Sequence, residues 1–299
     1  MTVRIITGDC RDVLKTLPDE SVHCVVTSPP YWGLRDYGVS GQMGLETTPA
    51  EFVAGMVGVF AEVRRVLRAD GTLWLNLGDS YAGGGCGSRE AERWPKQSRN
   101  DHMATHAKKH SGLKTKDLVG APWRVAFALQ ADGWYLRSDI IWSKPNPMPE
   151  GVTDRPTKAH EYIFLLSKSE RYFYDAAAIR EPLTEVSVLR AARANTGTHA
   201  PGQVQDGRNK RTVWEVATQP FSEAHFATFP PALIEPCILA GCPRGGVVLD
   251  PFGGAGTTGL VADRLGRDAV LIELNPAYAE MGRARIGADA PLLAKVAAE

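Results

Sequence analysis

A strand, a glycine-rich turn, a helix and a second strand follow one another between residues 246 and 274. The apolar run Gly-Val-Val-Leu-Asp predicts a strand that ends at Asp250, and a Pro-Phe-Gly-Gly-Ala-Gly turn separates it from a helix capped by Thr257 or Thr258. The run Asp-Ala-Val-Leu-Ile-Glu-Leu predicts the next strand, which carries Glu273 near its end. Glycines let the backbone approach a ligand closely, and apolar strands alternating with helices are typical of a parallel sheet covered on both faces.

The same alternation runs through the first part of the chain. Residues 3–27 predict a strand, a short helix and a second strand. A Thr-Pro-Ala-Glu capping box, with proline at the first helical position, begins a longer helix at residue 48. We expect Asp70 and Gly71 to end this helix before a strand at 72–80. The pattern predicts an α/β fold with a doubly wound, mostly parallel sheet.

Later segments complete the predicted sheet. Helices are expected at 117–131 and 231–240, and a strand at 134–144. Residues 160–169 and 171–175 are expected to be closing strands and to include an antiparallel hairpin. A last helix after Asn275-Pro276 precedes an alanine-rich tail that we expect to be frayed.

Two basic stretches interrupt the alternation. Residues 83–118 hold eight basic and four acidic side chains, a net charge of +4, and residues 176–213 hold six and three, a net charge of +3. Basic segments without periodicity are typical of arms that bind a polyanion, and solvated insertions are the alternative interpretation. His102, His106 and His110 have helical spacing, but no fixed frame of thiol or carboxylate ligands accompanies them, so we expect no metal site.

Composition excludes several classes of protein. The 299 residues are 43% hydrophobic and have a formal net charge of zero, which does not suggest a wholly basic nucleic-acid binder but permits local basic patches. No apolar run approaches the length of a membrane span, and the first residues lack the pattern of a signal peptide. The five cysteines form no Cys-x-x-Cys pair, so we expect buried thiols, a cytoplasmic location and no structural zinc.

The stretch Val-Val-Thr-Ser-Pro-Pro-Tyr-Trp-Gly, residues 25–33, ends a nearly continuous apolar strand. Its prolines fix φ and lack an N–H, which leaves the carbonyl groups there as acceptors. A rigid acceptor site beside the aromatic face of Tyr31 suits a planar group that carries an amine. A Pro-Pro turn with aromatic side chains in the core is the alternative interpretation.

The glycine-rich turn favours a nucleotide-like ligand. A phosphate-binding loop is disfavoured because no Gly-Lys-Ser/Thr follows. Gly254, Gly256 and Gly259 loosely match a dinucleotide fingerprint, but Asp250 would then stand beside a pyrophosphate. An acidic residue there better suits a ligand with a cationic end, such as the aminocarboxypropyl group of S-adenosylmethionine. Glu273 follows the glycines by about twenty residues, the distance at which an acidic residue binds ribose hydroxyls in dinucleotide folds.

Both stretches resemble motifs of the amino-methylating DNA methyltransferases. Asp-Pro-Phe-Gly-Gly-Ala-Gly-Thr-Thr is similar to the family's D-P-F-x-G-S-G-T-T motif, with Ala255 where serine is usual. Thr-Ser-Pro-Pro-Tyr-Trp is similar to the catalytic S/D-P-P-Y motif, and the segment from His225 resembles the one that precedes the cofactor strand. The resemblance covers nearly the whole chain apart from 83–118 and 176–213.

The order of the two motifs resembles the permuted beta group of that family, in which the catalytic motif comes first. The resemblance implies a Rossmann-like methyltransferase sheet with an antiparallel closing strand and inserted DNA-recognition loops. In this arrangement the strand ending at Glu273 lies between the cofactor strand and the N-terminal strand. The chain then divides into a catalytic half at 1–175, a target-recognition region at 176–213 and a cofactor-binding half of the same domain at 214–299.

The resemblance also implies methyl transfer from S-adenosylmethionine, with S-adenosylhomocysteine as product, to an exocyclic amine of a base flipped out of duplex DNA. Ser28 and the Pro29 carbonyl would accept the two N–H bonds of the amine, and Tyr31 would stack on the base. The implied catalytic residues are Ser28, Pro29, Pro30 and Tyr31. The implied cofactor-binding residues are Asp9, Asp250, Phe252, Gly254, Gly256, Thr257, Thr258 and Glu273.

Several of these residues have a plainer interpretation. Asp9 is expected near the cofactor adenine, with a helix cap as the alternative, and Phe252 is expected on the adenine or in the core. Asn76 and Asp79 end another strand and are expected to serve in a turn rather than in the pocket. Cytosine C5 methylation would need a cysteine after a proline, and Cys237, which alone follows one, falls inside a predicted helix.

Ser28 is an informative departure, because adenine-specific relatives usually have Asp or Asn there and serine is typical of N4-cytosine enzymes. The sequence therefore predicts N4-cytosine methylation, with N6-adenine methylation as the alternative. A non-catalytic DNA-binding protein and an RNA or small-molecule methyltransferase are the remaining hypotheses. A homodimer and a cognate restriction endonuclease are further partners that the family suggests and the sequence leaves open. The expected DNA contacts are Lys144, Asn146, Lys158, Arg190, Arg193, Arg208, Lys210 and Arg211.

Overall fold

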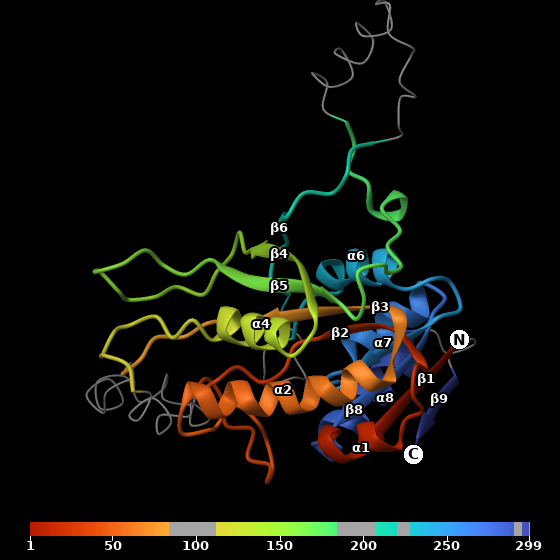
Figure 1. Ribbon diagram of the computed structural model, residues 1–299, viewed down its shortest axis with the longest axis horizontal. Helices are drawn as coiled ribbons and strands as arrows, with labels where there is room; N and C mark the ends of the chain where they lie inside the picture. Colours follow the sequence, from red (N-terminus) through yellow and green to blue (C-terminus); the bar gives the residue numbers. More distant parts are fainter. Residues whose placement is uncertain (84–111, 184–206, 220–227, 290–294, 299) are drawn as a thin grey trace, which may run out of the picture.

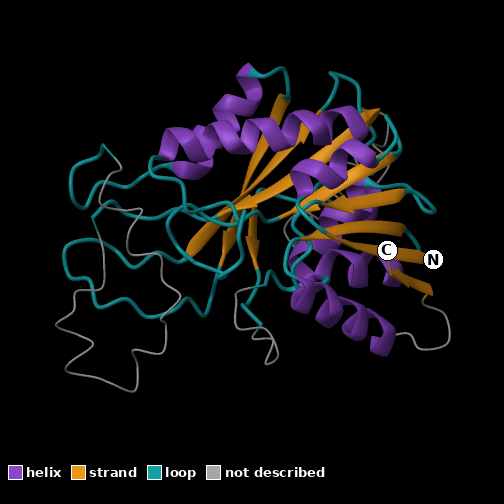
Figure 2. Cartoon of the chain, turned by 90° about the horizontal axis from the view of Figure 1, so that it is seen from below, coloured by secondary structure: helices purple, strands orange, loops and turns teal. Residues whose placement is uncertain are grey.

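One sheet organises the chain, with helices on both of its faces (Figure 2). The computed structural model describes residues 1–83, 112–183, 207–219, 228–289 and 295–298. The strands in this part of the chain are β1 (Thr2–Thr7), β2 (Val22–Thr27), β3 (Leu67–Leu77), β4 (Tyr135–Ser143), β5 (His160–Ser167), β6 (Val213–Glu215), β7 (Val247–Asp250), β8 (Asp268–Glu273) and β9 (Lys295–Ala298).

The strand order confirms the doubly wound, mostly parallel sheet. The strands are hydrogen-bonded in the order β6-β4-β5-β3-β2-β7-β8-β1-β9 (Figure 1). Among the described strands, β5 alone runs antiparallel to its neighbours, β3 and β4. Strand β8 pairs in parallel with both β7 and β1, so it lies between the cofactor strand and the N-terminal strand as the permuted order predicts.

The helices divide between the two faces of the sheet. Helices α1 (Cys10–Thr16), α2 (Pro49–Val66) and α4 (Ala121–Ala131) pack on one face, and α6 (Pro231–Gly241), α7 (Thr257–Arg264) and α8 (Pro276–Asp289) pack on the other. Side chains alternate between these two cores along β2, where Val25 faces the first core and Val26 the second. Burial of both faces explains why β2 is apolar at all but His23 and Thr27, and the strand fixes the position of the residues that follow it.

Helix α2 begins as the sequence predicts and ends earlier. The Thr48 side chain accepts from Glu51 N, and the Glu51 side chain accepts from Thr48 N, which is the predicted capping box. The helix ends at Val66 rather than at Asp70, because Leu67 is extended, fully buried and paired with Val22 in the sheet. Tertiary packing of this leucine overrides the helical pattern of the segment.

Three further segments differ from the prediction. Residues 171–175 form no strand; the backbone N–H of Phe173 instead donates to the Asp70 carbonyl, and the antiparallel hairpin consists of β4 and β5. Strand β6 lies in a stretch without a readable pattern, where the backbone pairs in parallel with β4. Strand β9 lies in the alanine-rich tail that we expected to be frayed, and it pairs in parallel with β1.

Other expectations from composition concern thiols, metals and membranes. Cys10, Cys24, Cys237 and Cys242 are free and buried, as expected, and Cys86 lies outside the described residues. Within the described ranges no group of three or more His, Cys, Asp or Glu side chains is arranged to hold a metal ion, and the three spaced histidines lie outside them. No described helix is both long and apolar enough to cross a membrane.

Candidate active site

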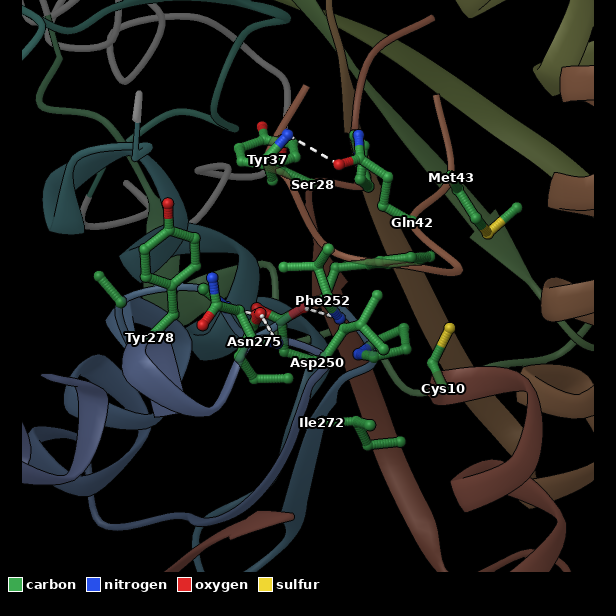
Figure 3. Close-up of a pocket in the computed structure, with 18 of the residues that line it drawn as sticks. Cys10, Ser28, Tyr37, Gln42, Met43, Asp250, Phe252, Ile272, Asn275 and Tyr278 are labelled. Carbon is green, nitrogen blue, oxygen red and sulfur yellow. Dashed lines mark hydrogen bonds between the residues drawn. The ribbon is translucent and has the colours of Figure 1, made fainter. Parts of the chain in front are cut away.

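The ends of four neighbouring strands open onto one cavity (Figure 3). It encloses about 960 Å³ of space, part of it open to solvent. Asp9 follows β1, Ser28 and Pro30 follow β2, and Asp250 and Glu273 end β7 and β8. The walls therefore come from both motifs, although the motifs lie more than two hundred residues apart in the chain. The sequence-predicted residues that line the cavity are Asp9, Ser28, Pro30, Asp250, Phe252, Gly254, Thr257 and Glu273.

Asp250 is a buried carboxylate with three hydrogen-bond donors. The residue is only 1% exposed, and its Oδ1 accepts from Thr27 Oγ1 at 2.6 Å and from Phe252 N at 3.0 Å. Oδ2 accepts from Thr258 Oγ1 at 2.6 Å. Burial raises the pKa of Asp250, and the hydrogen bonds from Thr258 and Thr27 oppose that rise. The aspartate thus fastens the ends of β2 and β7 to the start of α7.

The glycine turn reaches α7 without a side-chain cap. Gly256 is the N-cap residue, at φ 75°, so neither predicted threonine cap forms. A Cβ on Gly256 would lie 3.1 Å from Gly282 Cα of α8, so both the conformation and the close approach favour glycine. Thr257 Oγ1 instead accepts a hydrogen bond from Arg285 at 2.9 Å, and Thr258 Oγ1 donates one to Asp250. Gly256 and Thr258 support the cavity without lining it.

Glu273 holds the turn from the opposite side. Its Oε2 accepts from Gly254 N at 2.7 Å, and its Oε1 accepts from Asn275 N at 2.8 Å. Burial raises the pKa of Glu273, and these two backbone donors lower it. Each carboxylate oxygen keeps a second lone pair, which is available to a ligand hydroxyl in the cavity.

The Ser-Pro-Pro-Tyr loop is tied to the neighbouring strands. Ser28 Oγ lies 3.2 Å from Asn76 Oδ1 and 3.3 Å from Tyr31 Oη. Tyr31 Oη donates to Glu161 Oε2 at 2.6 Å and lies 3.0 Å from Asn76 Oδ1. Glu161 also pairs with Lys144, and both side chains are largely buried, at 15% and 18% exposed. No sequence pattern pointed to Glu161, because β3 and β5 bring it to Tyr31 from 130 residues away.

The ring of Tyr31 packs against the backbone that follows β3. A Cβ on Gly78 would lie 2.5 Å from Tyr31 Cε2, so the ring occupies the place that any other side chain would take. Burial, followed by the nearby Glu161 charge, raises the pKa of Tyr31 well above its usual range. Tyr31 and Pro29 do not line the cavity itself, so stacking of Tyr31 on a base stays a prediction.

Asn76 and Asp79 have different roles, although both were expected to serve in a turn. Asp79 does so: its carboxylate accepts from Ser80 N, Gly120 N and Ala121 N and thereby holds the start of α4. Asn76 is 4% exposed and contacts Ser28 and Tyr31. Its place on a buried strand was the available signal, since a buried amide needs partners.

The remaining walls include residues that carry no sequence motif. Tyr37, Gln42 and Met43 come from the glycine-containing loop after β2, and Tyr278 comes from the first turn of α8 (Figure 3). Gln42 Oε1 accepts from Tyr37 N at 2.7 Å, which closes this loop on itself. Phe229 lies in the segment that resembles the one before the cofactor strand. Because these aromatic residues belong to no motif, they could be assigned to the cavity only from the structure.

Asp9 is the helix cap of its alternative interpretation and also lies in the cavity wall, and its place near a cofactor adenine stays a prediction. It lines the cavity, and its Oδ1 accepts from Arg11 N at 2.9 Å as the N-cap of α1. The Arg11 guanidinium hydrogen-bonds the same carboxylate and lowers the pKa of Asp9. Arg11 also donates to the Gly41 carbonyl at 2.9 Å, so it connects α1 with the loop over the cavity.

The expected DNA contacts on and after β4 have partners within the protein. Lys144 pairs with Glu161, Lys158 Nζ donates to the Asp79 carbonyl at 2.9 Å, and Asn146 exchanges two hydrogen bonds with Thr218. Burial lowers the pKa of Lys158. Their contact with phosphate stays a prediction.

The basic side chains at the end of the expected recognition region also have partners. Arg208 and Arg211 both pair with Glu181 at 3.1 Å, and Lys210 Nζ lies 5.0 Å from the Trp214 ring centroid. Arg211 remains 68% exposed. Arg190 and Arg193 lie outside the described residues, as do most of residues 83–118.

Comparisons with known proteins agree with this geometry. Residues 22–284 match the N6/N4 family model, described as DNA methylase. The type II methyltransferase M.Cfr9I of Citrobacter freundii is 49% identical over 294 residues, 98% of this chain and 91% of the relative. The type II methyltransferase M.SmaI of Serratia marcescens is 49% identical over 283 residues, 95% of this chain and 90% of the relative.

Solved structures share the fold over nearly the whole chain. A Thermus thermophilus protein described as a putative DNA modification methylase, in complex with S-adenosyl-L-methionine, is 25% identical, with a TM-score of 0.62 over 99% of this chain and 100% of that one. The cytosine-N4-specific PvuII DNA methyltransferase is 20% identical, with a TM-score of 0.65 over 94% of this chain and 85% of that one. Two motifs on one sheet edge, the family match and the close relatives together show that this chain belongs to the N6/N4 family of DNA methylases.

Proposed function

We propose that this DNA methylase transfers the methyl group of S-adenosylmethionine to the exocyclic N4 amine of a cytosine flipped out of duplex DNA. The observation that carries the proposal is Ser28, a neutral acceptor in the same cavity as Asp250, Phe252 and Glu273. A hydroxyl at this position is typical of N4-cytosine enzymes in the family that the sequence resembles. The likeness to a cytosine-N4-specific enzyme supports the fold that this chemistry needs.

The residues of the cavity fit S-adenosylmethionine. Asp250 and Glu273 provide buried carboxylates for a cationic end and for ribose hydroxyls, and Phe252 and Tyr278 provide aromatic surface for a purine. Bound there, the cofactor supplies an electrophilic methyl group on a sulfonium. Asp9 and Thr257 add polar groups to the cavity wall.

The target amine needs activation because its lone pair is delocalised into the ring. Ser28 Oγ and the Pro29 carbonyl accept its two N–H bonds, which aims the lone pair at the methyl group. With the cofactor held in this cavity, the new N–C bond would form as the S–C bond breaks and S-adenosylhomocysteine would be released. The amine nitrogen would lose one proton to water, since the cavity is partly open to solvent. Positioning and acceptor electrostatics supply the rate enhancement, and the base must leave the helix to reach the cavity.

The direct test is to identify the modified base. DNA exposed to the enzyme and S-adenosylmethionine is digested to nucleosides, which are separated by mass and retention, and its modified positions are mapped by sequencing. N4-methylcytosine is the expected product, and N6-methyladenine alone would replace the cytosine assignment with the alternative one. RNA and free nucleosides in the same assay test the third hypothesis, and methylation of none would leave only a DNA-binding role.

The proposal includes the biological setting of the enzyme. The relatives are type II methyltransferases, so we propose a cognate restriction endonuclease as the partner that the methylation blocks. Genomic DNA as substrate implies a cytoplasmic enzyme. A homodimer is tested by measuring the mass of the enzyme in solution with and without DNA.

A further inference from the structure

Among the described residues, the Ser28 hydroxyl has two hydrogen-bonding neighbours, Asn76 and Tyr31, and the first cannot donate a hydrogen bond to it. Asn76 Nδ2 donates to the Tyr162 carbonyl at 3.0 Å and contacts Glu161 Oε2 at 3.3 Å. These two acceptors fix the orientation of the amide, so Asn76 Oδ1 is the atom that lies 3.2 Å from Ser28 Oγ. A carbonyl oxygen can only accept, so the hydrogen of this contact belongs to Ser28.

The second neighbour, Tyr31, has a single hydroxyl hydrogen. Glu161 Oε2 lies 2.6 Å from Tyr31 Oη and is a carboxylate oxygen that only accepts, so this hydrogen points to Glu161. Lys144 pairs with the other carboxylate oxygen of Glu161, Oε1, so Oε2 is the oxygen that faces the tyrosine hydroxyl. Tyr31 therefore has no hydrogen left for Ser28, and its oxygen, 3.3 Å from Ser28 Oγ, can only accept from it.

We propose that Glu161 is a positioning residue for methyl transfer, which acts through Tyr31 and Asn76 to keep the Ser28 hydroxyl an acceptor toward the target amine. Ser28 has a single hydroxyl hydrogen, and both inward neighbours can only accept it, which leaves the oxygen lone pairs for the cavity. This proposal rests on the proposed function, because it explains why the Ser28 hydroxyl accepts a hydrogen bond from the target amine rather than donating one.

The network solves a problem that serine brings to this position. An aspartate at the catalytic motif is an acceptor by its nature, whereas a serine hydroxyl can rotate and donate. Cytosine presents an acceptor nitrogen beside its N4 amine, and a freely rotating hydroxyl would bond to that nitrogen instead. The charge that an aspartate would place at the amine is here located two hydrogen bonds away, at Glu161.

The test is the isosteric change Glu161→Gln. The amide can donate to Tyr31, which frees the tyrosine hydrogen for Asn76 or Ser28 and reverses the order of donors. We expect single-turnover methylation of duplex DNA to slow by about tenfold or more, since a charged hydrogen bond in a dry site is strong. The affinities for DNA and S-adenosylmethionine should change by less than about threefold, because the change acts on the transition state.

A matched control separates the effect of reversing the hydrogen bonds at Ser28 from the effect of losing an ion pair. Asp289→Asn removes a carboxylate that pairs with Arg264 and is 25% exposed, outside the residues that line the cavity. We expect it to lower the melting temperature about as much as Glu161→Gln does, with unchanged methylation. A larger loss of melting temperature or cofactor affinity in Glu161→Gln would show that Glu161 acts on the fold, and would overturn the proposal.

The decisive measurement compares the effect of Glu161→Gln on the methylation rate in the unmodified enzyme with its effect in the Ser28→Ala variant. If Glu161 acts through Ser28, Glu161→Gln should slow the remaining activity of Ser28→Ala little or not at all, so that the two effects do not add. An equal slowing with and without Ser28, or no slowing in either, would overturn the proposal. Failure of the proposed function is distinguishable, because the unmodified enzyme would then not methylate cytosine at all.

Discussion

Thr27 Oγ1 donates a hydrogen bond of 2.6 Å to Asp250 Oδ1, across 223 residues of sequence. Thr27 ends β2, immediately before the Ser-Pro-Pro-Tyr loop, and Asp250 ends β7, immediately before the glycine turn. Both residues are buried, at 0% and 1% exposed. A single side-chain contact therefore joins the residue that precedes the acceptor loop to the one that precedes the cofactor turn.

Replacing Thr27 by valine keeps the shape of the side chain and removes one donor from a buried carboxylate. We expect a loss of about 1–3 kcal/mol in the free energy of unfolding, together with weaker binding of S-adenosylmethionine. Denaturant unfolding and calorimetric titration measure the two effects. Thr72→Val on β3 is the control, because in the described part of the chain the Thr72 hydroxyl contacts Cys24 and Trp74 and no carboxylate. Equal losses of cofactor affinity in both variants would contradict the role of the Thr27–Asp250 contact.

Gly78→Ala should impair methylation more than cofactor binding. The new Cβ would lie 2.5 Å from Tyr31 Cε2, so the ring must move and its hydrogen bond to Glu161 must lengthen. A loss in turnover of about tenfold or more is expected, on the order of the loss of one charged hydrogen bond. Gly58→Ala in α2 is the control, because its Cβ would meet no described atom within 4 Å, and it should be neutral or slightly stabilising. Normal turnover in Gly78→Ala would show that the position of Tyr31 is unimportant.

Ser28→Ala should separate turnover from cofactor affinity. The Ser28 hydroxyl contacts Asn76 and Tyr31 and carries the acceptor proposed for the amine, whereas Asp250 and Glu273 line the cavity from the ends of β7 and β8. We expect turnover to fall by about a hundredfold, with cofactor affinity within about threefold of the original. Single-turnover methylation and calorimetric titration provide the two numbers. A parallel loss of both would assign Ser28 to cofactor binding instead.

Cofactor affinity should weaken in mild acid. Burial raises the pKa of Glu273, so on acidification this carboxyl gains its proton at a higher pH than an exposed glutamate does. The charged form is the one that accepts ligand hydroxyls, so affinity should hold at neutral and alkaline pH and fall as the pH drops through the raised pKa. Titration calorimetry at a series of pH values measures this. The Glu273→Gln variant should bind S-adenosylmethionine weakly at every pH, and its affinity should depend less on pH. If its affinity has the same pH dependence as that of the unmodified enzyme, Glu273 is not the titrating group.

Arg211 tests the expected contact with DNA. It is 68% exposed although it pairs with Glu181, so its guanidinium can reach a phosphate without unfolding the protein. Arg211→Ala should weaken DNA binding and reduce the slope of log affinity against log salt by about 1. Arg264→Ala, which breaks the pair with Asp289 between α7 and α8, is the control and should leave the slope unchanged. Equal slopes for Arg211→Ala and the unmodified enzyme would remove Arg211 from the interface.

The sequence was informative where local chemistry decides the structure. Capping of α2 by Thr48 and Glu51, the strand before Asp250 and the place of the strand ending at Glu273 all follow from short patterns or from the motif order. It was uninformative where distant partners decide. Leu67 leaves the helix because Val22 pairs with it, and the tail strand β9 forms because β1 offers it an edge.

The same division holds in the candidate site. Ser28, Asp250 and Glu273 are found from motifs because each stands in a stretch of recognisable residues. Glu161 lies in an apolar strand that carries no recognisable motif, and the sequence places Asn76 in a turn, so neither residue was predicted to act in the site. Their importance comes from hydrogen bonds across the sheet, which no spacing along the chain encodes.

The position of β1 has a consequence for how the protein is made. Val3 pairs with Ala269 of β8 and with Val296 of β9. The first strand to be synthesised therefore pairs with two of the last. Pairing across such separations carries a large loop-closure entropy and is slow. During translation β1 stays without its neighbours until the ribosome has passed the glycine turn, so the cofactor cavity is assembled late. A chain truncated before β8 would therefore expose an apolar strand edge, which favours aggregation.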